Sequence, residues 1–303
     1  MPLVLGIIGR RFIQSAGAMV LFGSSLFFLY GHLFPATTEP GQLNWTRALL
    51  LVAAATLVIA APLQFITQTA NLAGSWGAAF EKDSLSAALQ MSFGKASVAR
   101  TGLALAACAI AFWRPPGPRT WKVIGVLGAL ICASFAWMGH GAAGEGAPGL
   151  VHLVADILHS LGAAGWIGAL VVFWLAIRLP AVPSRDLSQS LIAFSGTGTL
   201  IVALIVGTGV VNSVFLAGWN PAQAIGTRYG QVLAVKLALF VVMLVLAAAN
   251  RFRHAPALAR SVRGGAIPDL SALKASLMAE TCTALLVLVA VSWLGTLAPV
   301  TAQ

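Results

Sequence analysis

Residues 150–178 read LVHLVADILHSLGAAGWIGALVVFWLAIR. From Ser160 to Ile177 this stretch contains no ionisable side chain. An α-helix rises about 1.5 Å per residue and the hydrocarbon core of a bilayer is about 30 Å thick, so roughly 20 apolar residues cross it. The stretch therefore predicts a transmembrane helix with three ionisable groups, His152, Asp156 and His159, toward one end.

The composition of the whole chain indicates a membrane protein. Of its 303 residues 59% are hydrophobic and 9% are charged, against about 25% charged in an ordinary soluble domain. The 18 basic and 8 acidic side chains cannot cover the surface of a soluble fold of this size, which excludes a soluble enzyme and a disordered chain. The net charge of +10 comes from basic residues between apolar runs. We therefore expect contact with the lipid bilayer and no nucleic-acid partner.

Eight apolar runs are long enough to span a bilayer, and strands of alternating polarity are absent from the sequence. Since lipid leaves helices as the only solution for such runs, we expect an all-α polytopic membrane bundle of about eight helices, forming a single integral membrane domain over 1–303. The predicted helices are about 5–31, 46–70, 96–113, 121–139, 150–178, 191–217, 230–250 and 272–297.

The basic residues predict the orientation of these helices. Arg and Lys concentrate in the connections 114–122, 178–185 and 251–274, whereas 140–149 contains none and 218–229 only Arg228. The positive-inside rule places the three basic connections in the cytoplasm and both termini outside. Arg10 and Arg11 alone would favour the opposite orientation, but the three connections outweigh them. Residues 71–95 are compatible with a surface helix, and 251–271 are expected to be a basic loop on the inner leaflet.

The ionisable groups of 150–178 are candidates for a metal site. His152, Asp156 and His159 share one helix face, because their i, i+4, i+7 spacing keeps them within about 60°. The two histidines lie about 10 Å apart along the axis, so we do not expect one metal ion to bind both. Further ligands must come from another helix or the preceding connection. The candidates there are Met138, His140 and Glu145. Interhelical hydrogen bonding is the competing interpretation.

Imidazole suits copper, zinc, iron and nickel, and a thioether shifts the preference toward Cu(I), so copper fits this set best. The cysteines Cys108, Cys132 and Cys282 show no disulfide or zinc pattern. Lys236 is expected at the depth of Asp156, with Glu280 deeper toward the cytoplasm, and a structural ion pair is the simpler interpretation for each. Further candidates for ligands or for the lining of a pathway are Met91, Gln64, Gln68, Asn71, Asn212, Tyr229, Lys236 and Glu280.

Several motifs, taken together and in order, resemble the CopD (PcoD) copper-resistance membrane proteins. They are GHGAAG (139–144), DILHSLGAAGWIG (156–168), GTGVVN (207–212), YGQVLAVKLAL (229–239), MLVLAAANR (243–251), ETCTALLVL (280–288) and LGTLAP (294–299). The resemblance implies an eight-helix protein of the bacterial inner membrane that transports copper, as Cu⁺ or Cu²⁺. It also implies a periplasmic CopC-type copper-binding partner and an external N-terminus.

Three functions remain open at this point. The first is a copper permease that takes the ion from the periplasm to the cytoplasm, in copper homeostasis or resistance. The second is a b-type membrane cytochrome with His140 and His159 as axial haem ligands. The third is a membrane anchor that docks periplasmic copper proteins. The sequence contains no nucleophile motif and no nucleotide-binding loop, so an enzyme is not expected.

Overall fold

The structure, a computed structural model, describes residues 2–34, 38, 40–138, 146–179 and 182–302. Eight of its helices are long and apolar enough to cross a membrane, which confirms the predicted all-α membrane bundle. The long helices are α1 (Pro2–Tyr30), α2 (Asn44–Ala73), α4 (Ser92–Trp113), α5 (Pro118–Ser134), α6 (Gly146–Ala176), α7 (Ser184–Ala217), α9 (Arg228–Ala249) and α11 (Ser271–Leu294). Shorter helices are α3 (Lys82–Gln90), α8 (Pro221–Ile225) and α10 (Ala255–Arg263).

The stretch 251–271 differs from the expected loop. A π-helical segment, Asn250–His254, continues α9 directly into α10. This extension is helical because α10 is amphipathic: Ala255, Leu258 and Ala259 are buried, while its arginines lie on the other face or at its end. The stretch 71–95 contains the short helix α3, in agreement with the expected surface helix.

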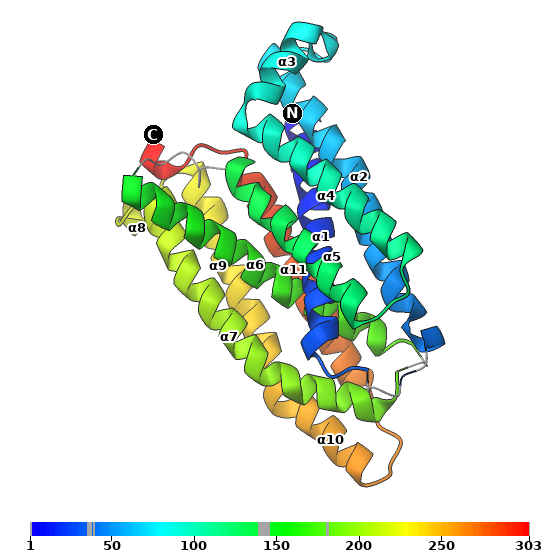
Figure 1. Ribbon diagram of the computed structural model, residues 1–303. Helices are drawn as coiled ribbons and strands as arrows, with labels where there is room; N and C mark the ends of the chain where they lie inside the picture. The colour runs from blue at the N-terminus through cyan, green and yellow to red at the C-terminus, as the bar shows by residue number, and fades with distance from the viewer. Residues whose placement is uncertain (1, 35–37, 39, 139–145, 180–181, 303) are drawn as a thin grey trace.

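Both ends of the described chain lie at the same end of the bundle, together with α3, and α10 lies at the opposite end (Figure 1). We call these two the α3 end and the α10 end. An even number of spans requires this arrangement of the termini. The helices therefore alternate in direction, and α6 runs from the α3 end toward the α10 end.

The closest helix crossing joins α1 to α6 through glycine. A Cβ atom on Gly23 would lie 1.8 Å from the carbonyl oxygen of Ala164, and one on Gly168 would lie 2.1 Å from the carbonyl carbon of Gly23. Small residues let membrane helices approach backbone to backbone, where dispersion contacts hold them together. This crossing fixes α6 within the bundle, close to the middle of its length.

A buried arginine ties α4 to α1 and to the end of α5. Arg100 is 0% exposed, and its guanidinium donates to Gln14 Oε1 at 3.1 Å and to Ser134 Oγ at 2.9 Å. Its central carbon also lies 4.2 Å from the centre of the Phe135 ring, a cation–π distance. The first five spans thus contain a charge that is permanent, because a guanidinium does not lose its proton in a protein.

Candidate functional site

The candidate face lies in the first half of α6, toward the α3 end. α6 is one continuous helix, so His152, Asp156 and His159 occupy one face as predicted. His152 is 6% exposed, and its ring stacks on Phe215 of α7 with centroids 4.8 Å apart and planes 2° from parallel. This contact fixes the plane of the His152 imidazole.

His159 is held in a defined tautomer by α7. Its Nδ1 lies 3.1 Å from the carbonyl oxygen of Ile205 and 3.1 Å from Thr208 Oγ1. A carbonyl only accepts, and the Thr208 hydroxyl donates to the Leu204 carbonyl at 2.6 Å, so the hydrogen between these groups belongs on Nδ1. Nε2 then carries a lone pair. Histidines that bind metals are oriented in this way, with the other ring nitrogen donating to a carbonyl or carboxylate.

α9 brings a cation and a phenol to the same face. Lys236 lies within electrostatic range of both Asp156 and His159, and Tyr229 lies within range of Asp156. The sequence placed Lys236 at the depth of Asp156, and the structure puts the two side chains within electrostatic range of each other. The face therefore combines a carboxylate, an ammonium group, a phenol and an imidazole, contributed by α6 and α9.

Asn212 adds an unsatisfied oxygen atom on α7. It lies between Thr208, which contacts His159, and Phe215, which stacks on His152. In the described part of the chain its buried Oδ1 has no hydrogen-bond partner. An acceptor oxygen in this position is available to a cation. Asn212 was a candidate from the sequence. The structure places it on α7 between the two residues that contact His159 and His152.

Of the other predicted residues, those that the structure describes do not join this face. His140, Glu145 and the side chain of Met138 lie outside the described residues. Met91, at the junction of α3 and α4, is 46% exposed. Among the described residues no group of three or more His, Cys, Asp or Glu side chains is placed to hold a metal ion.

The predicted polar stripe of α2 is divided between two environments. Gln64 and Thr67 are buried, Gln68 is half-buried and Asn71 is exposed. Thr67 donates to the Leu63 carbonyl of its own helix, and both amide atoms of Gln64 lack a partner within the described residues. The stripe therefore does not form one continuous lining.

Apart from Asn212, sequence reasoning missed the residues that α7 contributes to the site. Thr208 lies within GTGVVN (207–212), where Gly209 also makes room for the imidazole: a Cβ there would lie 3.3 Å from His159 Cε1. Phe215 carried no signal, because an apolar residue in an apolar helix gives no indication of which neighbour it contacts.

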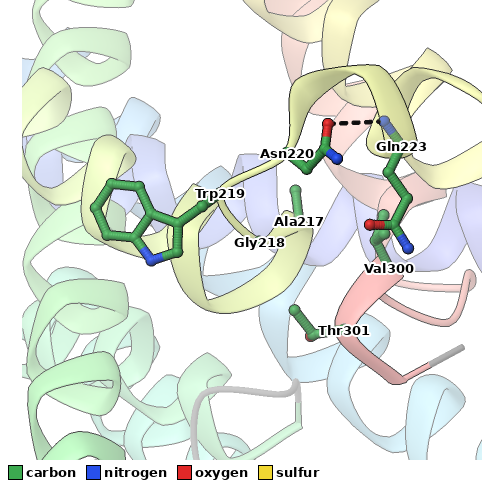
Figure 2. Close-up of a pocket in the computed structure, with 7 residues that line it drawn as sticks. All are labelled: Ala217, Gly218, Trp219, Asn220, Gln223, Val300 and Thr301. Atoms are coloured by element: carbon green, nitrogen blue, oxygen red, sulfur yellow. Dashed lines mark hydrogen bonds between the residues drawn. The ribbon is translucent and has the colours of Figure 1, made fainter.

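A depression lies at the α3 end, where α7 turns into α8 (Figure 2). It is lined by Ala217, Gly218, Trp219, Asn220, Gln223, Val300 and Thr301. Asn220 Oδ1 caps α8 by accepting from the backbone N–H groups of Ala222 and Gln223 at 3.1 and 3.2 Å. Thr301 Oγ1 donates to the Phe215 carbonyl at 3.0 Å, so the depression begins beside the residue that stacks on His152.

Comparison with known proteins agrees with the chemistry of this face. Residues 1–150 match the family described as copper resistance protein D-like, N-terminal domain, and residues 188–294 match copper resistance protein D. The chain is 36% identical to copper resistance protein D of Pseudomonas syringae pv. tomato over 96% of both chains. The chain belongs to the CopD copper-resistance family. The family predicted from the sequence motifs is thereby confirmed.

Two further relatives of this CopD-family protein are informative. It is 29% identical to inner membrane protein YebZ of Escherichia coli K12, over 82% of this chain and 84% of that protein. It is 31% identical to copper transport protein CutJ of Bacillus subtilis 168, over 76% of this chain and 43% of the longer relative. No solved structure matches the chain. Residues 152–159 lie between the two matched segments, whereas Asn212 and Lys236 lie within the second.

Proposed function

We propose that this CopD-family protein conducts copper ions across the inner membrane, from the periplasm to the cytoplasm. The observation that carries the proposal is the arrangement at His159. There the Ile205 carbonyl and Thr208 hold Nδ1, and this leaves the lone pair on Nε2 of a ring that lies within electrostatic range of Lys236. A polar face of this kind is costly in a bilayer unless it serves the movement of an ion.

The donor atoms suit copper in either oxidation state. The imidazole of His159 or His152, the carboxylate of Asp156 and the amide oxygen of Asn212 form a nitrogen and oxygen set that favours Cu²⁺. A thioether from Met138 would favour Cu⁺. His140 and Glu145 are proposed as further ligands from the connection that precedes α6.

Lys236 gives the face a built-in cation. Its ammonium lies within electrostatic range of Asp156, and in our proposal this reduces the cost of burying the carboxylate while no metal is bound. In our proposal an arriving copper ion takes over this role, and Lys236 then shifts away from the carboxylate. Tyr229 is also within electrostatic range of Asp156, so in our proposal it lies near the carboxylate that changes its partner.

The positive-inside rule supports the direction of insertion. Its three basic connections precede α5, precede α7 and include the π-helical segment and α10, so we place the α10 end in the cytoplasm and the α3 end, with both termini, in the periplasm. We propose that a periplasmic CopC-type protein delivers copper at the α3 end. The depression beside Trp219, a side chain that is 84% exposed, offers a contact surface there.

Copper stoichiometry of purified variants tests the site. We expect His159→Ala to lose most of the bound copper, and we compare it with His140→Ala, His152→Ala and the control His254→Ala in the π-helical segment. Because a metal-bound imidazole has lost its proton, binding should also weaken below roughly pH 6. Full copper retention in all three site variants would place the site elsewhere. An intense Soret band in the wild-type protein would favour the cytochrome alternative instead.

A further inference from the structure

Glu280 is a buried carboxyl group in the half of the bundle nearer the α10 end. It lies on α11, is 3% exposed, and its two oxygens have different partners. Oε1 accepts from the indole Nε1 of Trp166 on α6 at 3.0 Å, and Oε2 accepts from the amide Nδ2 of Asn250 at 2.7 Å. Both donors are neutral. The sequence favoured an ion pair for Glu280, whereas the two hydrogen-bond donors found among the described residues are both uncharged.

The charged groups on the elements around Glu280 lie elsewhere. Those of α6, with Tyr229 and Lys236 of α9, belong to the face described above. Arg228 of α9 has its guanidinium carbon 5.5 Å from the centre of the Trp293 ring, thirteen residues beyond Glu280 along α11. Arg11 of α1 packs beside Gly295, fifteen residues beyond Glu280. The basic groups of the π-helical segment are exposed or half-exposed, and Lys274 of α11 is exposed. The groups concerned are His152, Asp156, His159, Arg228, Tyr229, Lys236, Arg10, Arg11, Arg251, Arg253, His254 and Lys274.

An ionised carboxylate in this position is therefore uncompensated by any described cation. Taking a single carboxylate out of water costs several kcal/mol or more unless a cation or a proton neutralises it. The Trp166 ring packs edge-to-face against Phe194, with the ring centroids 6.5 Å apart and the ring planes at 84°. This contact helps to orient the indole toward Glu280. The surroundings of Glu280 are thus preformed, and they leave a proton as the neutralising partner.

Asn250 can serve both protonation states of Glu280. In the structure its amino group donates to Oε2, and its own carbonyl oxygen, Oδ1, is buried without a partner among the described residues. Turning the amide over exchanges these two atoms. The amino group then no longer faces Oε2, and Oδ1 takes its place as an acceptor for the O–H of a protonated Glu280.

The backbone at Asn250 links this pair to the α10 end. Asn250 is the first residue of the π-helical segment Asn250–His254, and the next three residues are exposed. π-helical turns are rare and frequently occur at functional sites. Here the segment joins the buried amide to the exposed Arg251 and Arg253, and the chain continues from it into α10 at the end of the bundle (Figure 1). We infer that a proton reaches the carboxyl group from this end.

We propose that Glu280, with Trp166 and Asn250, is a proton-binding site whose carboxyl group exchanges one proton with water at the α10 end and couples ion movement through the bundle to that proton. The carboxylate and a proton from water give the neutral acid, and release reverses the step. The binding of the proton stands on the geometry alone. Its coupling to copper rests on the proposed function.

Infrared difference spectra of the protein in lipid nanodiscs test the binding directly. Between two pH values the wild type should show the C=O stretching band of a protonated carboxylic acid. That band should be missing in Glu280→Gln and retained in Glu81→Gln, which alters an exposed glutamate at the start of α3. Absence of the band from the folded wild type at every pH, or its survival in Glu280→Gln, would overturn the proposal.

A second variant keeps the test decisive should Glu280→Gln fail to fold. Trp166→Phe removes the indole that donates to Oε1, the oxygen that remains a carbonyl when Oε2 carries the proton. A carbonyl that loses a hydrogen bond absorbs at higher frequency, so the acid band should persist and move upward. A band at an unchanged frequency would assign the acid to another residue and refute the proposal.

Copper uptake into liposomes tests the coupling. With the membrane potential clamped by potassium and valinomycin, a gradient of one pH unit should change the copper accumulation ratio about tenfold if one proton moves per ion. Glu280→Gln should retain copper binding and lose this tenfold response. Copper uptake by the wild type that does not change with the pH gradient would refute the coupling. Failure of all copper uptake would refute the proposed function and leave the infrared result standing.

Discussion

Two polar groups lie along α6, and they balance charge in different ways. Toward the α3 end, Asp156 lies within electrostatic range of Lys236, so both signs of charge are present near each other. Toward the α10 end, Glu280 is contacted by two neutral donors, Trp166 and Asn250. The first group can exchange one cation for another without a proton. The second reaches neutrality by taking up a proton.

From this difference we infer that the two groups along α6 have different chemical roles, one suited to a metal ion and the other to a proton. The face around His159 offers a free imidazole nitrogen, an amide oxygen and a carboxylate, which are ligands for a metal ion. The cluster around Glu280 offers one carboxyl group and an amide that can donate or accept. Arg100 provides the contrast for both, since its buried charge is fixed and its partners hold it in place. Of Asp156, Glu280 and Arg100, only Glu280 is both buried and able to lose its charge by taking up a proton.

The largest expected effect comes from breaking the crossing on which both groups depend. Gly23→Ala would place a methyl group 1.8 Å from the Ala164 carbonyl oxygen, which belongs to the backbone and cannot move aside as a side chain would. Overpacking in a close-packed interior costs about 1–3 kcal/mol and sometimes more. We expect about 3 kcal/mol or more here, measured as the loss of folded protein and of thermal stability.

Gly207→Ala is the matched control for this variant, because a Cβ on Gly207 of α7 meets nothing within 4 Å. Its stability should stay within about 0.5 kcal/mol of the wild type. Equal losses in the two variants would show that α1 and α6 do not cross at glycine.

A smaller loss of stability is expected when the charges of the Asp156–Lys236 group are removed. Asp156→Asn and Lys236→Met should each cost about 1–3 kcal/mol, because each leaves the other charge with one partner fewer. The double variant should be less unstable than the sum, with a coupling free energy of about 0.5–3 kcal/mol in a double-mutant cycle. Fully additive losses would show that the two side chains do not interact. Combining Asp156→Asn with Glu280→Gln should give additive losses, since the two groups are separate.

The sequence predicted the helices better than their neighbours, for a physical reason. Bilayer thickness sets the length of a span whatever the fold, and the 100° step of a helix places His152, Asp156 and His159 on one face. Which helix lies opposite depends on packing between distant segments. Thr208 and Phe215 therefore gave no signal, and Trp166 looked like any aromatic residue of an apolar helix.

For Glu280, too, the sequence predicted the position of the residue but not its partners. Its burial in a span was predicted, together with an ion pair to neutralise it. The partners found are the indole of Trp166 and the amide of Asn250. Asn250 could not be recognised because the sequence placed the end of a span there, whereas the π-helical segment continues the helix and keeps the side chain buried. A local insertion in a helix leaves no mark in an apolar periodicity.

The smallest expected effect compares Glu280 with the exposed carboxylate that precedes the same helix. Asp269 accepts from the backbone N–H of Ser271 at 2.9 Å and from its hydroxyl at 3.0 Å, and these hydrogen bonds hold the pKa of Asp269 below its ordinary value. A lowered pKa in the folded state stabilises the fold above the ordinary value of about 3.9, and this contribution is lost as the pH falls through the lowered pKa. Asp269→Ala should therefore lower the Tm slightly at pH 7, and the difference should shrink as the pH falls below about 3.9 and through the lowered pKa.

The same variant sharpens the assignment of the proton. Since Asp269 stays ionised at every pH above its lowered pKa, Asp269→Ala should leave the carboxylic-acid band of the infrared spectrum unchanged near neutral pH. An exposed carboxylate that accepts hydrogen bonds from two donors is not stabilised by taking up a proton near neutral pH. A buried carboxylate that has neutral donors and no described cation is stabilised by a proton. Loss of the band in Asp269→Ala would move the proton to the surface and remove the distinction between the two ends of α6.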